Sequence, residues 1–160
     1  MTTIELLLAA LDAAYDQPSW HGTNLRGAVR GVTPEQAAWR PGEDRHNIWE
    51  LAVHAAYWKY DVRRRLTGAK AHTFPLAGSD FWWRPIEGTV KEWKADLALL
   101  DTEHRALRDA VAKFPEKRWT EKAPRKPFKF EGLVRGVAAH DLYHAGQIQL
   151  LKALQRQTVD

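Results

Sequence analysis

Two histidines and a glutamine occur close together in the segment HDLYHAGQIQLLKAL, residues 140 to 154. His140 and His144 are four residues apart, and residues at this spacing lie on the same side of an α-helix with Cβ atoms about 5 to 6 Å apart. Both imidazoles can therefore reach one metal ion at a bond length of about 2.0 to 2.1 Å. The sequence thus raises the question of whether this helix carries part of a metal site.

The same segment has a helical hydrophobic pattern, which predicts that one side of it faces a protein core. At about 100° per residue, this side continues upstream of residue 140 and forms a stripe made of Leu133, Val137, His140, His144, Gln147, Leu151 and Leu154. A buried imidazole or amide costs about 1 to 3 kcal/mol unless a partner satisfies it. A metal ion would be such a partner.

A third histidine, His54, is expected on the inner face of another long helix, together with Leu51, Trp58 and either Asp61 or Val62. Three imidazoles then converge from two helices, and three histidines with open positions describe a catalytic metal site rather than a closed structural one. The alternative is three separate core histidines satisfied by neighbouring side chains. The zincin motif HExxH is a poor match, because Asp141 replaces its glutamate and no histidine follows His144.

The composition limits the kind of protein and the kind of site. The chain has 160 residues, of which 44% are hydrophobic and 28% charged, so we expect one globular domain over residues 1–160. It has no cysteine, which excludes a disulfide framework and a thiol nucleophile and leaves nitrogen and oxygen as metal ligands. The longest apolar run, residues 6 to 11, is far shorter than the roughly 20 residues of a membrane helix. We expect a cytoplasmic protein without a signal peptide or a membrane span.

The charge pattern argues against a nucleic-acid binder. The net charge is +4, but the 24 basic and 20 acidic residues are largely interspersed. The denser basic clusters lie at a predicted helix end, where Arg63, Arg64 and Arg65 complement the helix dipole, and in a proline-containing loop over residues 118–129. A solvated basic face explains both clusters better than a phosphate site does.

The hydrophobic periodicity predicts helices and no strands. Four long helices are expected over residues 3–16, 47–66, 89–114 and 131 to the C-terminal end, with a short helical segment through Leu25 and Val29 and another short turn opened by residues 33–35. A loop over residues 68–88 carries Phe74, Phe81, Trp82 and Trp83 and is of the kind that lines pockets or interfaces. The predicted fold class is an antiparallel four-helix bundle.

Two segments, NIWELAVHAAYW (residues 47–58) and AAHDLYHAGQIQLLK (residues 138–152), resemble the DinB/YfiT-like family of metal-binding helical bundles, which is distinct from the DNA polymerase of similar name. The segments PSWHGTNL and GVTPEQAAWRPGEDRHNIWEL are similar to one branch of that family. The family motif is one histidine on the second long helix and an H-x-x-x-H-x-G-Q pair on the last helix. It is matched here by His54, His140, His144, Gly146 and Gln147.

The resemblance implies an up-down-down-up four-helix bundle, a zinc or nickel ion on these three histidines, and a homodimer. It also implies a split in activity, because characterised relatives include thiol S-transferases and isomerases that use low-molecular-weight thiols, while most members have no established reaction, and it fixes no substrate. A divalent ion on three neutral imidazoles can activate water or such a thiol. We therefore expect a metal-dependent transferase or hydrolase acting on a small molecule. The alternative is a non-catalytic metal-binding protein, or a damage- or stress-response interaction protein, with a structural histidine site.

Other residues are candidates for supporting roles. Gln147, one turn beyond His144, is placed to orient water, substrate or an imidazole, and Asp141 is placed to accept a proton or to form an outward salt bridge. Tyr57, Trp58 and Trp82 are candidate walls of a substrate pocket. Two further histidines remain open: His104 as a fourth ligand, a supporting group or a core residue, and His21 as a pocket residue or an exposed one.

Overall fold

The structure, a computed structural model, describes residues 1–76 and 87–157. Within these ranges the chain is helical and forms no strand, only an isolated bridge between Lys122 and Lys129, so the predicted all-α class is confirmed. Phe81, Trp82 and Trp83 lie outside the described residues. The helices are α1 (Thr3–Tyr15), α2 (Leu25–Ala28), α3 (Pro34–Ala38), α4 (Ile48–Thr67), α5 (Val90–Lys113), the 3₁₀ turn η1 (Glu116–Arg118) and α6 (Phe130–Gln157).

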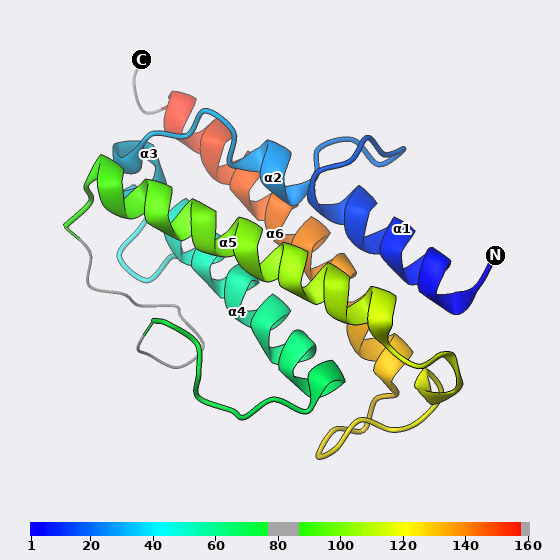
Figure 1. Cartoon of the computed structure of the whole chain (residues 1–160). Coiled ribbons are helices and arrows are strands. Elements are labelled where there is room, and N and C mark those ends of the chain that lie inside the picture. The colour runs from blue at the N-terminus through cyan, green and yellow to red at the C-terminus, as the bar shows by residue number, and fades with distance from the viewer. Residues whose placement is uncertain (77–86, 158–160) are drawn as a thin grey trace.

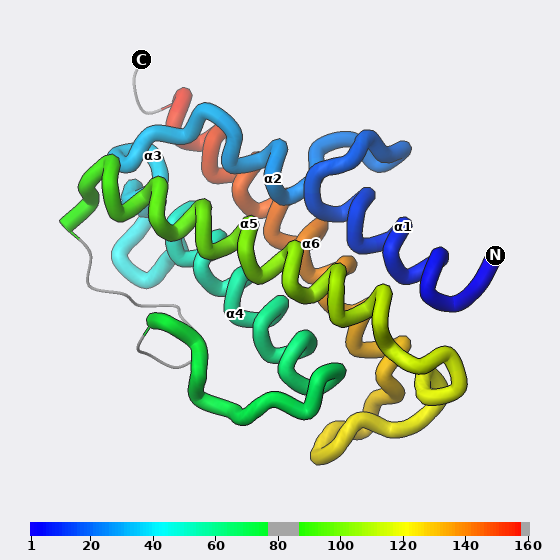
Figure 2. Tube along the Cα trace, in the orientation of Figure 1, coloured from blue at the N-terminus to red at the C-terminus, as the bar shows by residue number. Residues whose placement is uncertain are grey.

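The four longer helices lie side by side. In Figure 1, α4 and α5 run from left to right, whereas α1 and α6 run in the opposite direction. Helix α4 packs against both α5 and α6, and α1 packs against the same two helices. The short helices α2 and α3 pack on α6 and α4 near one end, as the backbone trace in Figure 2 shows. The pair α4 and α6 brings the two predicted histidine segments together.

Local sequence signals fix where these helices begin. Before α1, α3, α4 and α5, the N-cap side chain accepts a hydrogen bond from the backbone N–H of the residue three positions later. The side chain of that later residue in turn accepts a hydrogen bond from the N-cap backbone N–H. At the other end of α4, Gly68 has a left-handed conformation with φ of +71°, which glycine adopts without steric cost. The ends of α4 are therefore encoded locally, and His54 lies within its first half.

The buried side of α6 differs in phase from the predicted stripe. Val137, His144 and Leu151 are buried as expected, but Leu133, His140, Gln147 and Leu154 are only half-buried. Five other buried positions lie about one residue further round the helix: Val134, Ala138, Asp141, Ala145 and Ile148. The shift arises because α6 contacts α1, α2 and α4 together, so its buried sector is wider than one stripe. The histidine pair consequently lies at the border of the core.

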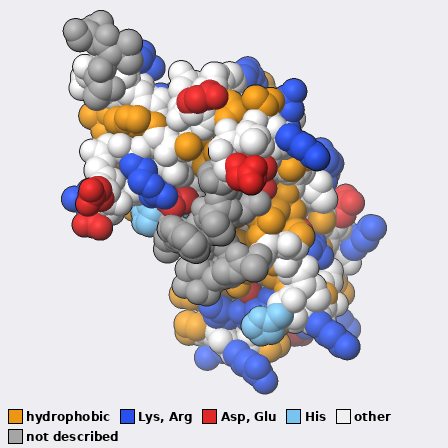
Figure 3. Space-filling model, turned by 90° about the vertical axis from the view of Figure 1, so that its left-hand side faces the viewer, with side chains coloured by type: hydrophobic (Ala, Val, Ile, Leu, Met, Phe, Trp, Pro, Cys, Tyr) orange, Lys and Arg blue, Asp and Glu red, His pale blue; other side chains and the backbone are white. Residues whose placement is uncertain are grey.

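On one face of the molecule (Figure 3), charged side chains are interspersed with side chains of other kinds. On the face drawn in Figure 3, lysine and arginine side chains are spread around the outline, with acidic and hydrophobic groups between them. Among the described helices, none combines the length and the apolar content needed to cross a membrane.

Candidate metal centre

His54, His140 and His144 form one cluster between α4 and α6. The Nε2 atom of His140 lies 3.2 Å from Nε2 of His54 and 2.9 Å from Nε2 of His144. One ligand atom from each of the three residues lies within 4.8 Å of the others. His54 and His144 are buried and His140 is half-buried. The structure thus brings together the three histidines that the sequence singled out.

The spacing of these nitrogen atoms fits a shared metal ion. Two ligands at about 2.0 to 2.1 Å from a tetrahedral zinc ion are about 3.3 Å apart, close to the two Nε2 separations in the cluster. Three nitrogen atoms at this distance cannot all carry protons toward one another, because a hydrogen bond needs one donor and one acceptor. The separations therefore suit one cation shared by the three Nε2 atoms, once Nε2 of His54 gives up the hydrogen bond that it accepts from the Trp58 indole.

Burial keeps two of the imidazoles in the neutral form that binds metal. The pKa of His140 is lowered to about 3, first by desolvation and then by the neighbouring His144, His54 and Lys59. The pKa of His144 is also lowered, chiefly by burial, although its hydrogen bond to Gln147 opposes the shift. At neutral pH neither proton has to be displaced for a metal ion to bind.

Gln147 and Trp58 contact the cluster from two sides. The Nδ1–H of His144 donates to the Gln147 side-chain oxygen at 2.6 Å, which leaves Nε2 of His144 as the acceptor atom. The indole N–H of Trp58 donates to Nε2 of His54 at 3.1 Å. Trp58 therefore presents a hydrogen-bond donor beside the atoms that would hold the ion.

Asp141 points into the core rather than outward. It forms an ion pair with Lys59 of α4, and both side chains are completely buried. Burial raises the pKa of Asp141 to about 6, and the adjacent Lys59 ammonium opposes that shift. Asp141 does form a salt bridge, one of the alternatives expected for it, but an inward one, because the buried side of α6 is centred on this residue.

Lys59 is the important residue that the sequence interpretation missed. Its position in the sequence could have revealed it, because Lys59 occupies one place in a series spaced by three and four residues along α4 whose other members are apolar: Ala52, Ala55, Val62 and Leu66. A lysine on such a stripe needs an acidic partner from another helix. The sequence alone does not say which acid that is.

The other candidate residues lie apart from the cluster. His104 is buried against Tyr15, with the two rings stacked at 3.8 Å, and His21 is exposed in the loop after α1. His104 is therefore a core histidine in this structure.

A cavity of about 690 Å³ opens beside the histidine cluster. Its wall includes His54, Trp58 and His140, so two of the three histidines face it. Tyr57 is not among its lining residues and packs instead against Tyr60 and Phe74, with ring centres 5.7 and 5.4 Å away. The cavity is large enough for a small molecule to reach the cluster.

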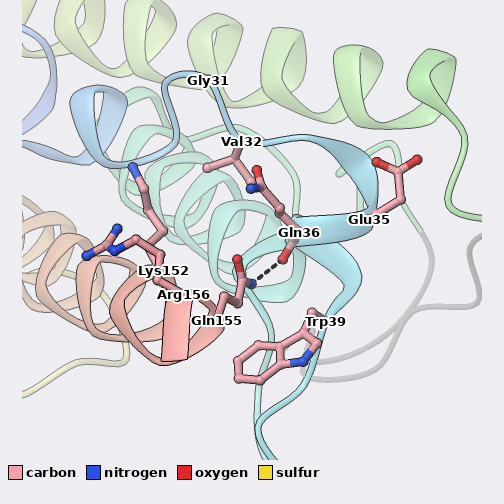
Figure 4. Close-up of a pocket in the computed structure, with 8 residues that line it drawn as sticks. All are labelled: Gly31, Val32, Glu35, Gln36, Trp39, Lys152, Gln155 and Arg156. Carbon is pink, nitrogen blue, oxygen red and sulfur yellow. Dashed lines mark hydrogen bonds between the residues drawn. The ribbon is translucent and has the colours of Figure 1, made fainter. Parts of the chain in front are cut away.

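A second pocket, of about 420 Å³, lies between α3 and the end of α6 (Figure 4). The Gln155 amide donates to the Gln36 carbonyl oxygen at 2.6 Å, and the Lys152 ammonium donates to the Ala28 carbonyl oxygen at 3.0 Å. None of the three clustered histidines lines this pocket. Its polar groups thus tie α6 to the short helices.

The fold and the cluster define an all-helical protein whose three histidines are compatible with metal binding. A family model described as the DinB superfamily matches residues 17–148, a range that contains all three histidines. The chain therefore belongs to the DinB superfamily, and the resemblance drawn from the motifs is confirmed. No curated protein and no solved structure matches the chain.

Proposed function

We propose that the protein is a metal-dependent enzyme that binds one divalent ion through His54, His140 and His144. The observation that carries the proposal is the convergence of three Nε2 atoms, two pairs of which lie 2.9 and 3.2 Å apart. Zinc or nickel is the ion that we propose, because both accept imidazole ligands readily. Among the described residues, three supply ligand atoms to this centre, which leaves room for a substrate.

A divalent ion on three neutral imidazoles would lower the pKa of a bound water or small thiol and so supply a nucleophile at neutral pH. The protein's own residues do the remaining work in this proposal. Gln147 holds His144 in the tautomer that coordinates, and the cavity wall positions the substrate. The Trp58 N–H donates to a substrate oxygen once Nε2 of His54 is occupied. The reaction class is transfer to a low-molecular-weight thiol cosubstrate or hydrolysis of a small molecule.

The test is metal content, measured by mass spectrometry on protein purified without an affinity tag or chelator. The matched variant replaces His54, His140 and His144 with alanine, and His21→Ala controls for the loss of an exposed histidine. We expect about one ion per chain in the wild type and the control, and none in the triple variant. Absence of any ion after reloading with zinc, nickel or manganese would contradict the proposal.

A non-catalytic metal site, including one in a stress-response interaction protein, is the alternative function. The cavity beside His54 and His140 favours the enzyme, because a purely structural ion needs no substrate-sized space next to it. Turnover of small esters, or of electrophiles with added thiols, by the metal-loaded protein separates the two. Stoichiometric metal without turnover across both panels would favour the structural role.

The architecture and assembly that we propose for this enzyme are an antiparallel up-down-down-up four-helix bundle, a homodimer and a cytoplasmic location. The directions of α1, α4, α5 and α6 in Figure 1 support the bundle. Tyr143 and Leu150, spaced by seven residues on α6 and 64% and 61% exposed, support a dimer surface. Sedimentation analysis tests the dimer, and a monomer at micromolar concentration would contradict it.

A further inference from the structure

The cavity beside the histidines has an uneven charge. Lys126 lines it and forms no ion pair with a described residue; its ammonium lies 5.8 Å from the centre of the Trp58 ring. The acidic residue in the same wall, Asp61, is already bound by the guanidinium groups of Arg64 and Arg65. Among the described residues of the wall, Lys126 is thus the charge that remains available to a ligand.

The loop that carries Lys126 is held in place against α4. Within the loop, the Ala123 N–H donates to the Phe128 carbonyl oxygen at 3.0 Å, and Ala123 itself is buried. Across to α4, the Arg65 guanidinium donates to the Pro124 carbonyl oxygen at 3.2 Å. The backbone on either side of Lys126 is therefore held against α4, which limits how much of the loop must be ordered when a ligand binds.

The floor of the cavity is made by the first half of α6. Gly132 and Gly136 precede His140 at intervals of four residues, so all three lie along one side of the helix. A β-carbon built on Gly136 would meet no atom within 4 Å. Leu133, Val137 and Phe128 add apolar surface around this groove. The absence of two side chains leaves an open path from the loop to His140.

We propose that this groove binds a small carboxylate with an apolar body. Its carboxylate pairs with Lys126, its body lies on Trp58 and the glycine floor, and its far end reaches His54 and His140. The ring centre of Trp58 is 5.8 Å from the Lys126 ammonium and 6.1 Å from the His54 ring centre, so the molecule is short. Binding of the carboxylate in the groove does not depend on the proposed function. Only a reaction at the far end of the molecule, beside the histidines, rests on that proposal.

The charge is tested by calorimetric titration with phenylacetate, 3-phenylpropionate and 4-phenylbutyrate and with their uncharged amides. We expect the wild type to bind at least one acid about fivefold more tightly than its amide, the scale of one partly exposed ion pair. Lys126→Gln should abolish that preference, and Lys129→Gln, on the same loop but exposed, should keep it. The inference would be overturned if Lys126→Gln kept the same preference for the acid over the amide as the wild type. It would also be overturned if the wild type bound none of the acids at millimolar concentration.

The floor is tested with Gly136→Leu, which fills the groove, beside Ala139→Leu on the exposed side of the same helix. Binding of the acid should fall at least tenfold in Gly136→Leu and stay within twofold in the control. The thermal midpoint of Gly136→Leu should not fall, because leucine favours helix more than glycine does. Unchanged binding in Gly136→Leu would overturn the groove assignment.

Metal content measured on the same samples keeps the two proposals distinct. Carboxylate preference without metal would contradict the metalloenzyme and leave the groove assigned. Metal without carboxylate preference would contradict the groove alone.

Discussion

Gln147 fixes which nitrogen of His144 is available to a metal ion, since its side-chain oxygen accepts the Nδ1–H at 2.6 Å. Gln147→Leu keeps the size of the side chain but removes that acceptor. We expect metal affinity to fall about 10- to 100-fold, the usual effect of losing a group that orients a ligand. Competition with a coloured chelator measures the change, and Gln149→Leu, an exposed glutamine of the same helix, is the control. An unchanged affinity would show that packing alone orients the imidazole.

His104 gives the protein an acid sensitivity of its own. Its pKa is lowered to about 3, first by burial and then by Lys59, Arg108 and Arg105, whereas an unfolded histidine titrates near 6.5. Below pH 6.5 the unfolded chain therefore binds more protons at this site, and the free energy of unfolding falls as the pH drops toward 3. The slope from one such group is at most about 1.4 kcal/mol per pH unit.

The variant His104→Leu removes that titration. We expect it to lose less stability than the wild type between pH 6.5 and 4, as measured by urea unfolding of chelator-treated protein. His21→Leu is the control, because His21 is exposed in the folded chain. Parallel stability curves for His104→Leu and the wild type would contradict the expectation.

At the scale of elements, Lys59 and Asp141 determine how α4 and α6 meet. Both side chains are completely buried; Asp141 directly follows His140 on α6, and Lys59 lies five residues after His54 on α4. Lys59→Met would leave a buried carboxylate without its cation, which costs about 3 to 5 kcal/mol of folding free energy. The double variant Lys59→Met, Asp141→Leu should regain most of this loss.

Chemical denaturation measures both effects. The exposed pair of Arg118 and Glu121 provides the contrast, because breaking a surface ion pair costs at most about 1 kcal/mol. If the double variant were as unstable as Lys59→Met, the buried pair would contribute more to the folding free energy than the neutralisation of one charge by the other.

Helix positions and the histidine pair of α6 could be predicted from sequence because their signals are local. The N-cap residues Thr2, Asn47 and Thr89 each precede a glutamate by three residues, and His140 and His144 have helical spacing. These patterns depend only on neighbouring residues of one helix.

The remaining features depend on contacts between distant segments. The phase of α6 is set by three neighbouring helices, and Asp141 meets Lys59 across 82 residues of chain. The position of Lys126 depends on the bond from Arg65 to Pro124, 59 residues apart. Hydrophobic periodicity carries no information about such pairs, so the wall of the cavity could not be derived from it.

At the scale of the whole molecule, metal binding should appear as thermal stability. An ion at about 100 times its dissociation constant adds about 2.7 kcal/mol to a state that alone binds it. For a chain of this size that corresponds to a rise of roughly 5 to 11 °C in the melting temperature. Scanning fluorimetry with and without zinc measures it. The triple histidine variant should show no rise, and an equal rise there would place the ion elsewhere.

The three histidines differ in how far apart they lie along the chain. His140 and His144 belong to one turn of α6, while His54 is 86 residues away from His140. An ion can therefore engage the α6 pair as soon as that turn is helical, before any loop has closed, and loop closure is the slow, entropically costly part of assembly. Zinc present during refolding would then bind the α6 pair and stabilise that helix early, and His54 of α4 would join the ion last.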